Sequence, residues 1–147
     1  LEENTKEKFR WFIVGDGSER NKLQNMIENY GLNNQVILVG NKRNPYPYMK
    51  NADFLVHTSY VESQCLAVLE AMALGTPCVV TKSIGINEFA VNEYNCFLAE
   101  QNEMDLEKQI KKSMCQYINL DAIKKNAFRT IEQFSDKIVI FKIEQIL

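Results

Sequence analysis

The sequence predicts an α/β protein with a Rossmann-like, doubly wound parallel sheet that carries helices on both faces. Two observations lead to this class. Short, nearly continuous apolar runs alternate with amphipathic segments, as expected where helices cover both faces of a sheet. The chain also has 147 residues, of which 46% are hydrophobic, so it is long enough for an ordinary domain with a buried core. We therefore expect one domain over residues 1–147.

Five apolar runs are expected to form the strands of this sheet. They lie at residues 10–15, 35–40, 53–59, 77–82 and 96–99. The first run ends at Gly15, and four apolar residues then recur at helical spacing before Gly31 provides a helix stop. This part of the chain is therefore predicted to form a β-α unit that leads into the second strand.

Further helices are expected between and after the strands. Pro45 and Pro47 follow the second strand and predict a loop that feeds a short helix. Periodicity predicts helices over about 64–74 and 86–91. Beyond residue 105, three successive groups of apolar residues at helical spacing predict three terminal helices, the last near 138–146.

Charge and hydropathy exclude several kinds of partner. The formal net charge is −2, so the chain has no excess of basic residues for a nucleic acid. No apolar run approaches the roughly 20 residues of a membrane-spanning helix, and the first residues lack the apolar centre of a signal peptide. We expect a cytoplasmic protein with no transmembrane segment and no nucleic-acid partner.

The four cysteines are widely spaced, and each lies in or beside an apolar segment. They are Cys65, Cys78, Cys96 and Cys115. This spacing fits neither a zinc site of paired thiols nor a disulfide lattice, so we expect reduced thiols in the core or on helix faces. The chain also lacks an Asp-x-Asp motif and any His or Cys cluster with ligand spacing, so no metal and no cofactor are expected.

The most informative stretch is YVESQCLAVLEAMALGTPCVV, residues 60–80, which follows the third strand. Open parallel sheets bind ligands beyond the carboxyl ends of their strands, so this position suits a binding site. If a helix begins near Gln64, eight residues of helical rise separate Glu62 from Glu70 by roughly 12 Å. The two carboxyl groups of a glycoside hydrolase are only about 5 to 9.5 Å apart. The spacing therefore suits holding two ends of one ligand.

The expected helix start between the two acids suits an anion. The free N–H groups around Gln64, Cys65 and Leu66 can receive a diphosphate. An ionised carboxylate only accepts hydrogen bonds, so it can bind a pair of sugar hydroxyls. The alternative is that Glu62 and Glu70 are a chance pair on a surface helix, and their spacing alone leaves that alternative open.

Other candidate residues allow two interpretations each. His57, the only histidine, lies near the end of a predicted strand and serves either a bound ligand or the packing of the domain. Tyr46 and Tyr48 either stack on a base or pack against the protein. Gly15 and Gly17 resemble the start of a dinucleotide-binding loop, but the third glycine of that fingerprint is missing.

The stretch ESQCLAVLEAMALGTPCVV resembles the E-x7-E motif of retaining glycosyltransferases with the GT-B fold. It is similar in particular to glycosyltransferase family 4, where the motif reads close to EGFGLVLLEAMA.G.PVV. The preceding FIVGDGSERNKLQNMIENYGLNNQVILVGNKRNPYPYMKNADFLVHTSYVE resembles that family's order of a Gly-x-Gly loop, a helix, "V.flG", a short helix and "aD.fv..S..E". The resemblance covers residues 11–100.

The resemblance implies roles for individual residues. Glu70 matches the second acid, which in the family binds the ribose hydroxyls of the nucleotide. Glu62 matches the first acid, which lies at the donor sugar and assists transfer, so it is the expected catalytic residue. The backbone of Gln64, Cys65 and Leu66 takes the place of the amides that meet the sugar and the diphosphate.

A second group of expected donor contacts lies earlier in the chain. Gly40, Asn41 and Lys42 occupy the family's position for backbone contacts to the base, and Gly15 and Gly17 form its Gly-x-Gly loop. The resemblance thus implies a nucleotide-sugar donor as the main small-molecule partner.

The chain also departs from the family pattern. Ser63, Gln64 and Cys65 replace Gly-Phe-Gly, which leaves the sugar specificity open because glycine allows closer backbone approach. In the family, an Arg and a Lys clamp the diphosphate. They lie in a strand and loop that correspond to positions upstream of residue 1, so they are not in this chain. The resemblance therefore implies a donor-binding, C-terminal domain without its first strand, whose acceptor saccharide or lipid-linked sugar binds mainly to a missing N-terminal domain.

The expected reaction is transfer of a sugar from a nucleotide diphosphate sugar to an acceptor hydroxyl, with retention, in bacterial capsule or cell-surface polysaccharide synthesis. The parent protein is expected to work in the cytoplasm or at the inner face of the membrane, and the fragment alone to be inactive. One alternative is a non-catalytic α/β interaction domain that keeps the fold without binding a donor. Another is a sugar-nucleotide epimerase, which the incomplete Gly-rich loop disfavours.

Overall fold

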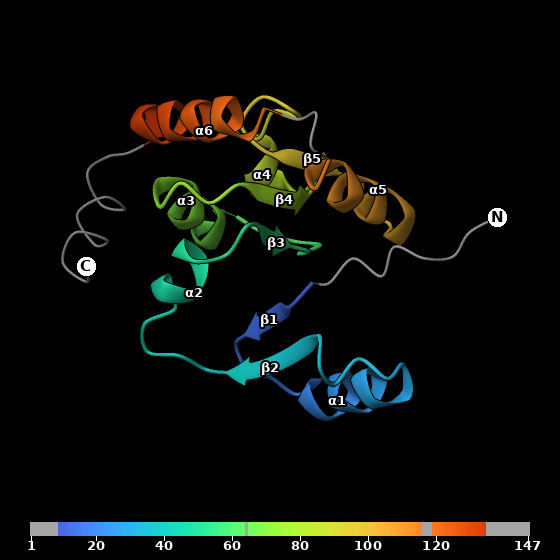
Figure 1. The fold of residues 1–147 in the computed structure, drawn as a ribbon. Helices are drawn as coiled ribbons and strands as arrows, with labels where there is room; N and C mark the ends of the chain where they lie inside the picture. Colours follow the sequence, from blue (N-terminus) through green and yellow to red (C-terminus); the bar gives the residue numbers. More distant parts are fainter. Residues whose placement is uncertain (1–8, 64, 116–118, 135–147) are drawn as a thin grey trace. The chain divides into compact units, whose positions relative to one another are not determined.

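The computed structural model describes residues 9–63, 65–115 and 119–134. The chain falls into two compact units, Leu1–Pro45 and Tyr46–Leu147, and each is described by itself. Both units are built from parallel strands joined by helices (Figure 1). The third terminal helix expected near 138–146 lies outside the described residues, as does Gln64.

The first unit is a β-α-β unit. Strand β1 (Trp11–Val14) is followed by helix α1 (Arg20–Asn29) and strand β2 (Val36–Gly40), and the two strands pair in parallel. Helix α1 ends because Gly31 takes a positive φ of 65°, which glycine adopts without steric cost. The β-α unit predicted from the apolar spacing is therefore confirmed.

The second unit contains a three-stranded parallel sheet in the order β3-β4-β5. Its strands are β3 (Leu55–His57), β4 (Cys78–Thr81) and β5 (Phe97–Ala99). Its helices are α2 (Tyr46–Lys50), α3 (Leu66–Ala73), α4 (Ile84–Asn87), α5 (Glu103–Ser113) and α6 (Leu120–Phe134). All four residues of the central strand β4 are buried, as its continuous apolar run predicts.

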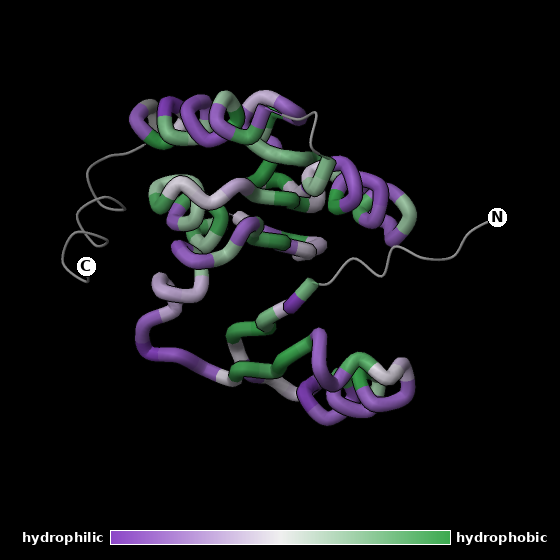
Figure 2. Tube along the Cα trace, in the orientation of Figure 1, coloured by the Kyte–Doolittle hydropathy of each residue, from purple (hydrophilic) through white to green (hydrophobic). Residues whose placement is uncertain are grey.

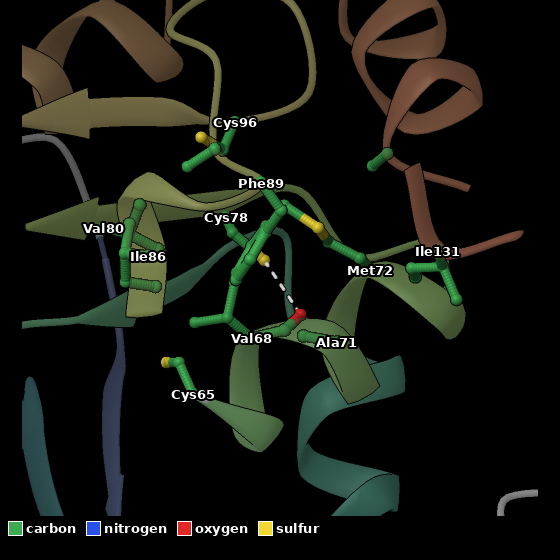
Figure 3. Packing of buried hydrophobic residues seen from close by; sticks show 12 residues of the cluster. Cys65, Val68, Ala71, Met72, Cys78, Val80, Ile86, Phe89, Cys96 and Ile131 are labelled. Atoms are coloured by element: carbon green, nitrogen blue, oxygen red, sulfur yellow. Dashed lines mark hydrogen bonds between the residues drawn. The ribbon is translucent and has the colours of Figure 1, made fainter. Parts of the chain in front are cut away.

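Two hydrophobic clusters lie on opposite faces of β4. Cys78 and Val80 belong to a cluster that α3, α4 and α6 complete, and Figure 3 shows the thiol of Cys78 pointing to the carbonyl oxygen of Val68, 3.9 Å away. Val79 belongs to the other cluster, which includes Phe97 and residues of α5. Because successive residues of a strand point to opposite faces, one short apolar run supplies both clusters. The prediction of parallel strands with helices on both faces is confirmed.

The distribution of apolar residues agrees with this layering. Figure 2 shows strands β3 to β5 as mainly hydrophobic, whereas α5 and α6 carry hydrophilic and hydrophobic residues in turn. Helix α6 uses its apolar positions in both clusters, with Ile123 in one and Ala127 and Ile131 in the other. Among the described residues, none of the helices combines the length and the apolar character that a membrane crossing requires.

The observed strands lie within the predicted runs, and two predicted helices differ from the observed ones. The helix expected from about residue 64 begins at Leu66, because Cys65 has left-handed φ and ψ values of 43° and 56° and cannot belong to the helix. The helix expected over 86–91 spans Ile84–Asn87 instead. Phe89 and Ala90, which follow this helix, pack into a hydrophobic cluster, whereas Val91 is exposed.

Candidate functional site

The candidate site in the second unit lies in the loop between β3 and α3. Glu62 is held there by two interactions. Its Oε1 accepts a hydrogen bond of 3.0 Å from the hydroxyl of Ser59, and its backbone carbonyl accepts one of 2.9 Å from the N–H of Gly85 in α4. The side chain of Glu62 remains 31% exposed. Its carboxylate is therefore positioned by the protein and still open to a ligand.

His57, the last residue of β3, lies beside this carboxylate. Its Nε2 is 3.4 Å from Oε1 of Glu62, and its side chain is 20% exposed. Nε2 itself is buried and makes no hydrogen bond within the described part of the chain. The structure therefore places the histidine at the candidate site, although a packing role was the other interpretation of the sequence.

Cys65 is the N-cap residue of α3 and is 3% exposed. Burial raises the pKa of its thiol to about 11, a hydrogen bond with the Val68 backbone opposes this shift, and the charge of Glu62 adds to it. The thiol is therefore neutral near pH 7. Its left-handed backbone explains why the resembling family has glycine at this position, since glycine reaches that region without strain.

Helix α3 has no side-chain cap at its start. The carbonyl of Cys65 accepts hydrogen bonds from the N–H groups of Val68 and Leu69, at 3.1 and 3.4 Å. The N–H groups of the first helical turn have no acceptor within their own helix. Leu66 has half of its side chain exposed at this end. Gln64, the other expected contact here, lies outside the described residues.

Glu70 lies in α3, about one turn beyond Leu66, the first residue of the helix, and is only partly exposed. Its Oε1 accepts a hydrogen bond of 3.1 Å from the hydroxyl of Tyr46 in α2. Tyr46 is 8% exposed, and burial, followed by the charge of Glu70 and this hydrogen bond, raises the pKa of its phenol. The structure therefore buries Tyr46 within the protein and uses it to orient Glu70.

Gln101 is a residue of this region that the sequence analysis missed. Its Nε2 donates to the carbonyl of Tyr60 at 2.7 Å and to the carbonyl of Lys82 at 2.6 Å. It thus ties the loop before α3 to the segment after β4. Nothing in its polar turn distinguishes Gln101 from neighbouring residues, because its partners lie 41 and 19 positions away in the sequence.

The glycines of the first unit that are expected to contact the donor lie at or after the ends of β1 and β2. The N–H of Gly15 donates to the carbonyl of Gly40 at 3.0 Å, and both residues have positive φ, 137° and 74°. The N–H of Gly17 donates to the Asp16 side chain at 2.9 Å. The structure therefore places Gly15 beside Gly40, where β1 and β2 end.

Asn41 and Lys42, which follow Gly40, are exposed. The residues expected at the base thus belong to the first unit, and Glu62, Cys65, Leu66 and Glu70 to the second. The role of each in donor binding stays a prediction.

Comparison with known proteins supports the resemblance. The family model described as "Glycosyl transferases group 1" matches residues 1–130. The chain is 36% identical over 94 residues to the UDP-Gal:alpha-D-GlcNAc-diphosphoundecaprenol alpha-1,3-galactosyltransferase of Escherichia coli, covering 63% of this chain and 24% of that protein. It is 28% identical over 130 residues to the N-acetylgalactosamine-N,N'-diacetylbacillosaminyl-diphospho-undecaprenol 4-alpha-N-acetylgalactosaminyltransferase of Campylobacter jejuni, covering 87% of this chain and 35% of that protein.

A solved structure agrees with these relatives. The crystal structure of Anabaena Alr3699/HepE in complex with UDP and glucose matches 93% of this chain with a TM-score of 0.79 and 28% identity. The match covers 39% of the Anabaena chain, so the present chain spans well under half of the proteins it resembles. Family match, relatives and fold agree that the chain belongs to the group 1 glycosyltransferases, enzymes with the GT-B fold.

Proposed function

We propose that this chain is the donor-binding part of a retaining glycosyltransferase that transfers a sugar from a nucleotide diphosphate sugar to an acceptor hydroxyl. One observation carries the proposal. Both acids of the E-x7-E motif are present and have partners that orient them, Ser59 for Glu62 and Tyr46 for Glu70. The helix start lies between them in the sequence, where its amides can receive a diphosphate.

Glu70 binds the ribose in this proposal. Its Oε1 already accepts a hydrogen bond from Tyr46. A carboxylate has about four acceptor positions, so Glu70 keeps capacity for two ribose hydroxyls. The buried tyrosine restricts the rotation of Glu70, which lowers the entropy cost of ordering it when the nucleotide binds.

Glu62 and the start of α3 serve the reacting end of the donor. The partial positive charge of the helix N-terminus favours the diphosphate, and this effect grows as negative charge develops on the leaving group. Glu62 lies in the loop just before this helix, where its negative charge can stabilise the sugar as positive charge builds on it. In the first unit, Gly40, Asn41 and Lys42 are proposed to contact the nucleotide base through their backbone, and Gly15 and Gly17 to take part in donor binding as the Gly-x-Gly loop.

The chain is proposed to act within a larger enzyme of cell-surface polysaccharide synthesis. Two relatives carry diphosphoundecaprenol-linked sugars in their names, which supports a lipid-linked acceptor here. Because the chain spans only part of these relatives, the acceptor site is proposed to lie mainly on another domain. Such an enzyme would work from the cytoplasm at the inner face of the membrane, and its transfer step would require no metal.

One observation favours a second candidate function, a non-catalytic interaction domain. Where the resembling family has the last glycine of Gly-Phe-Gly, this chain has the buried side chain of Cys65. A side chain at that position occupies space next to the helix start, which would restrict the approach of a donor.

Ligand-observed NMR separates the two functions. The chain is titrated with UDP, GDP, ADP and their common sugar conjugates, beside Glu70→Gln, which keeps the size of the side chain and removes its charge. Glu107→Gln is the matched control, since Glu107 is an exposed acid of another helix that pairs with Lys111. We expect one nucleotide to bind the wild type and the control, and its binding to weaken by more than about tenfold in Glu70→Gln.

Absence of binding by the chain calls for the same titration on the longer protein with its upstream loop. If that protein also binds no nucleotide, donor binding is rejected and the interaction domain is retained. Equal binding by the wild type and Glu70→Gln would reject the assignment of Glu70 to the ribose.

A further inference from the structure

Three side chains with different ligating atoms converge at the end of β3 and the start of α3. His57, Glu62 and Cys65 each offer one ligand atom, a ring nitrogen, a carboxylate oxygen and a sulfur, and these atoms all lie within 4.8 Å of one another. The sequence spacing did not indicate such a group. It forms because β3 ends at His57 and the loop then returns Glu62 and Cys65 to the same point.

The separation of His57 and Glu62 and the burial of the group are suitable for a small metal ion. Zn–N, Zn–O and Zn–S bonds of about 2.0 to 2.3 Å place two ligands of a tetrahedral ion about 3.3 to 3.8 Å apart. The nitrogen and oxygen of His57 and Glu62 are 3.4 Å apart, within this range. The group is accessible on one side, because the side chains of His57 and Glu62 are 20% and 31% exposed, whereas Cys65 is buried.

The hydrogen bonding of His57 adds a second indication. Nε2 of His57 is buried without a hydrogen bond among the described residues, although buried polar atoms nearly always have a partner. A metal ion bound through this nitrogen would satisfy it. Cys65 adds a thiol at a position where the resembling family has glycine, so the sulfur ligand is a feature of this chain.

We propose that His57, Glu62 and Cys65 form a binding site for Zn²⁺, with water completing the coordination. Imidazole and thiolate ligands favour zinc over the oxygen-preferring Mg²⁺ and Ca²⁺. On binding, the Cys65 thiol releases its proton to solvent, so one thiolate and one carboxylate balance the two positive charges of the ion. The ion is not a cofactor of transfer.

The site has a consequence for the enzyme, and this part rests on the proposed function. Glu62 cannot hold a zinc ion and face the donor sugar with the same free carboxylate. Zinc is therefore expected to compete with the nucleotide sugar and to inhibit the transferase reversibly, and a chelator is expected to restore donor binding.

Cobalt is the probe for metal binding, because a Co²⁺–thiolate bond gives a charge-transfer absorption that Co²⁺ bound to oxygen or nitrogen alone lacks. The 147-residue chain is titrated with Co²⁺ and then with Zn²⁺, which displaces it. We expect a single site whose charge-transfer band is absent in Cys65→Gly. Metal affinity should fall by more than about tenfold in His57→Asn and in Glu62→Gln.

The matched control is Cys115→Ser. Cys115 is the exposed thiol among the four cysteines, whereas Cys78 and Cys96 are buried like Cys65. The band should persist in this variant. Loss of the band in Cys115→Ser, or its persistence in Cys65→Gly, would show that the metal binds elsewhere. If the folded wild type takes up neither cobalt nor zinc, the site is rejected. Circular dichroism of each variant confirms that it is folded.

The competition is measured separately. Nucleotide-sugar affinity is determined with and without Zn²⁺ for each variant, and the ratio of the two values is compared. We expect a ratio of at least about tenfold for the wild type and near one for His57→Asn. If the wild type binds cobalt in the metal titration but its affinity ratio with and without Zn²⁺ is near one, the competition is rejected and the metal site stands. Absence of donor binding without zinc contradicts the proposed function instead.

Discussion

At the residue scale, Cys65 combines a buried thiol with a backbone conformation that side chains rarely adopt. Its φ of 43° lies in the left-handed region, where a residue with a Cβ is strained by about 1 kcal/mol. Strain of this kind persists where the surroundings enforce it, and here both motif acids lie within five positions of the residue. The position therefore links local strain to the candidate site.

A pair of substitutions measures this strain. Cys65→Gly and Cys65→Ala both remove the sulfur, but only glycine relieves the left-handed backbone. We expect the glycine variant to be more stable than the alanine variant by about 1 kcal/mol in chemical denaturation. Equal stability of the two variants would mean that the backbone at this position is not strained.

The hydrogen bond from Tyr46 to Glu70 can be tested by Tyr46→Phe. The substitution leaves a charged, half-buried carboxylate without its neutral donor, so we expect a loss of about 1 kcal/mol in unfolding free energy. Nucleotide binding should weaken as well, because Glu70 is no longer held in one orientation. Denaturation curves and the NMR titration give the two values.

The pH dependence of this variant has a definite sign. The pKa of Tyr46 is raised in the folded protein above its ordinary value of 10.0, so folding favours the protonated phenol. Its contribution to stability is complete below pH 10.0 and is lost as pH rises through the raised value. The difference in stability between wild type and Tyr46→Phe should therefore shrink above that pH, and a difference that grows there would contradict the assignment.

At the scale of elements, α6 is attached to the second unit through its apolar face. Ile131 is 2% exposed and belongs to the cluster that includes residues of α3. Phe128, in the same helix, is 45% exposed. Because both residues lie in the same helix, comparing substitutions at the two positions distinguishes the loss of buried contacts from a change in helix propensity.

Substitution of each residue by alanine tests this attachment. We expect Ile131→Ala to lower the unfolding free energy by about 2 to 4 kcal/mol, because it removes buried methyl groups and leaves a cavity. Phe128→Ala should change it by less than about 1 kcal/mol. Similar losses for both variants in urea denaturation would show that α6 does not pack as described.

At the scale of the whole molecule, the chain spans only part of the glycosyltransferases to which it is related. We expect the 147 residues alone to form no transfer product, because the acceptor site and the diphosphate clamp are proposed to lie elsewhere in the enzyme. Mass spectrometry of reactions with a nucleotide sugar and a lipid-linked acceptor measures this, with the longer protein as positive control. Product formation by the chain alone at the rate of the longer protein would contradict the division of roles.

Much of the fold was predictable because its signals are local. The run Cys78–Thr81 is apolar at every position but the last, so it indicated a strand buried on both faces, and the structure buries all four residues. The start of α3 was placed two residues too early, because periodicity does not reveal that Cys65 takes a left-handed conformation. The exact ends of helices and turns depend on backbone angles that several residue types can adopt, so the sequence predicts them less well than the elements themselves.

The site was predictable only in part. The spacing of Glu62 and Glu70 and the motif around them pointed to the correct family. Their partners did not follow from the sequence, since Tyr46 is 24 positions from Glu70 and its other interpretation was stacking on a base. Gln101, which joins two loops, was missed for the same reason.

The sequence by itself determined the alternation of strands and helices, the family and the two acids of its motif, because these depend on neighbouring residues. Only the tertiary structure decided that Tyr46 orients Glu70 and that His57 and Cys65 meet at Glu62. Contacts of this kind depend on how the strand, the loop and the helix pack against one another. Packing is set by the hydrophobic clusters as a whole, so no local pattern around His57 or Tyr46 records it.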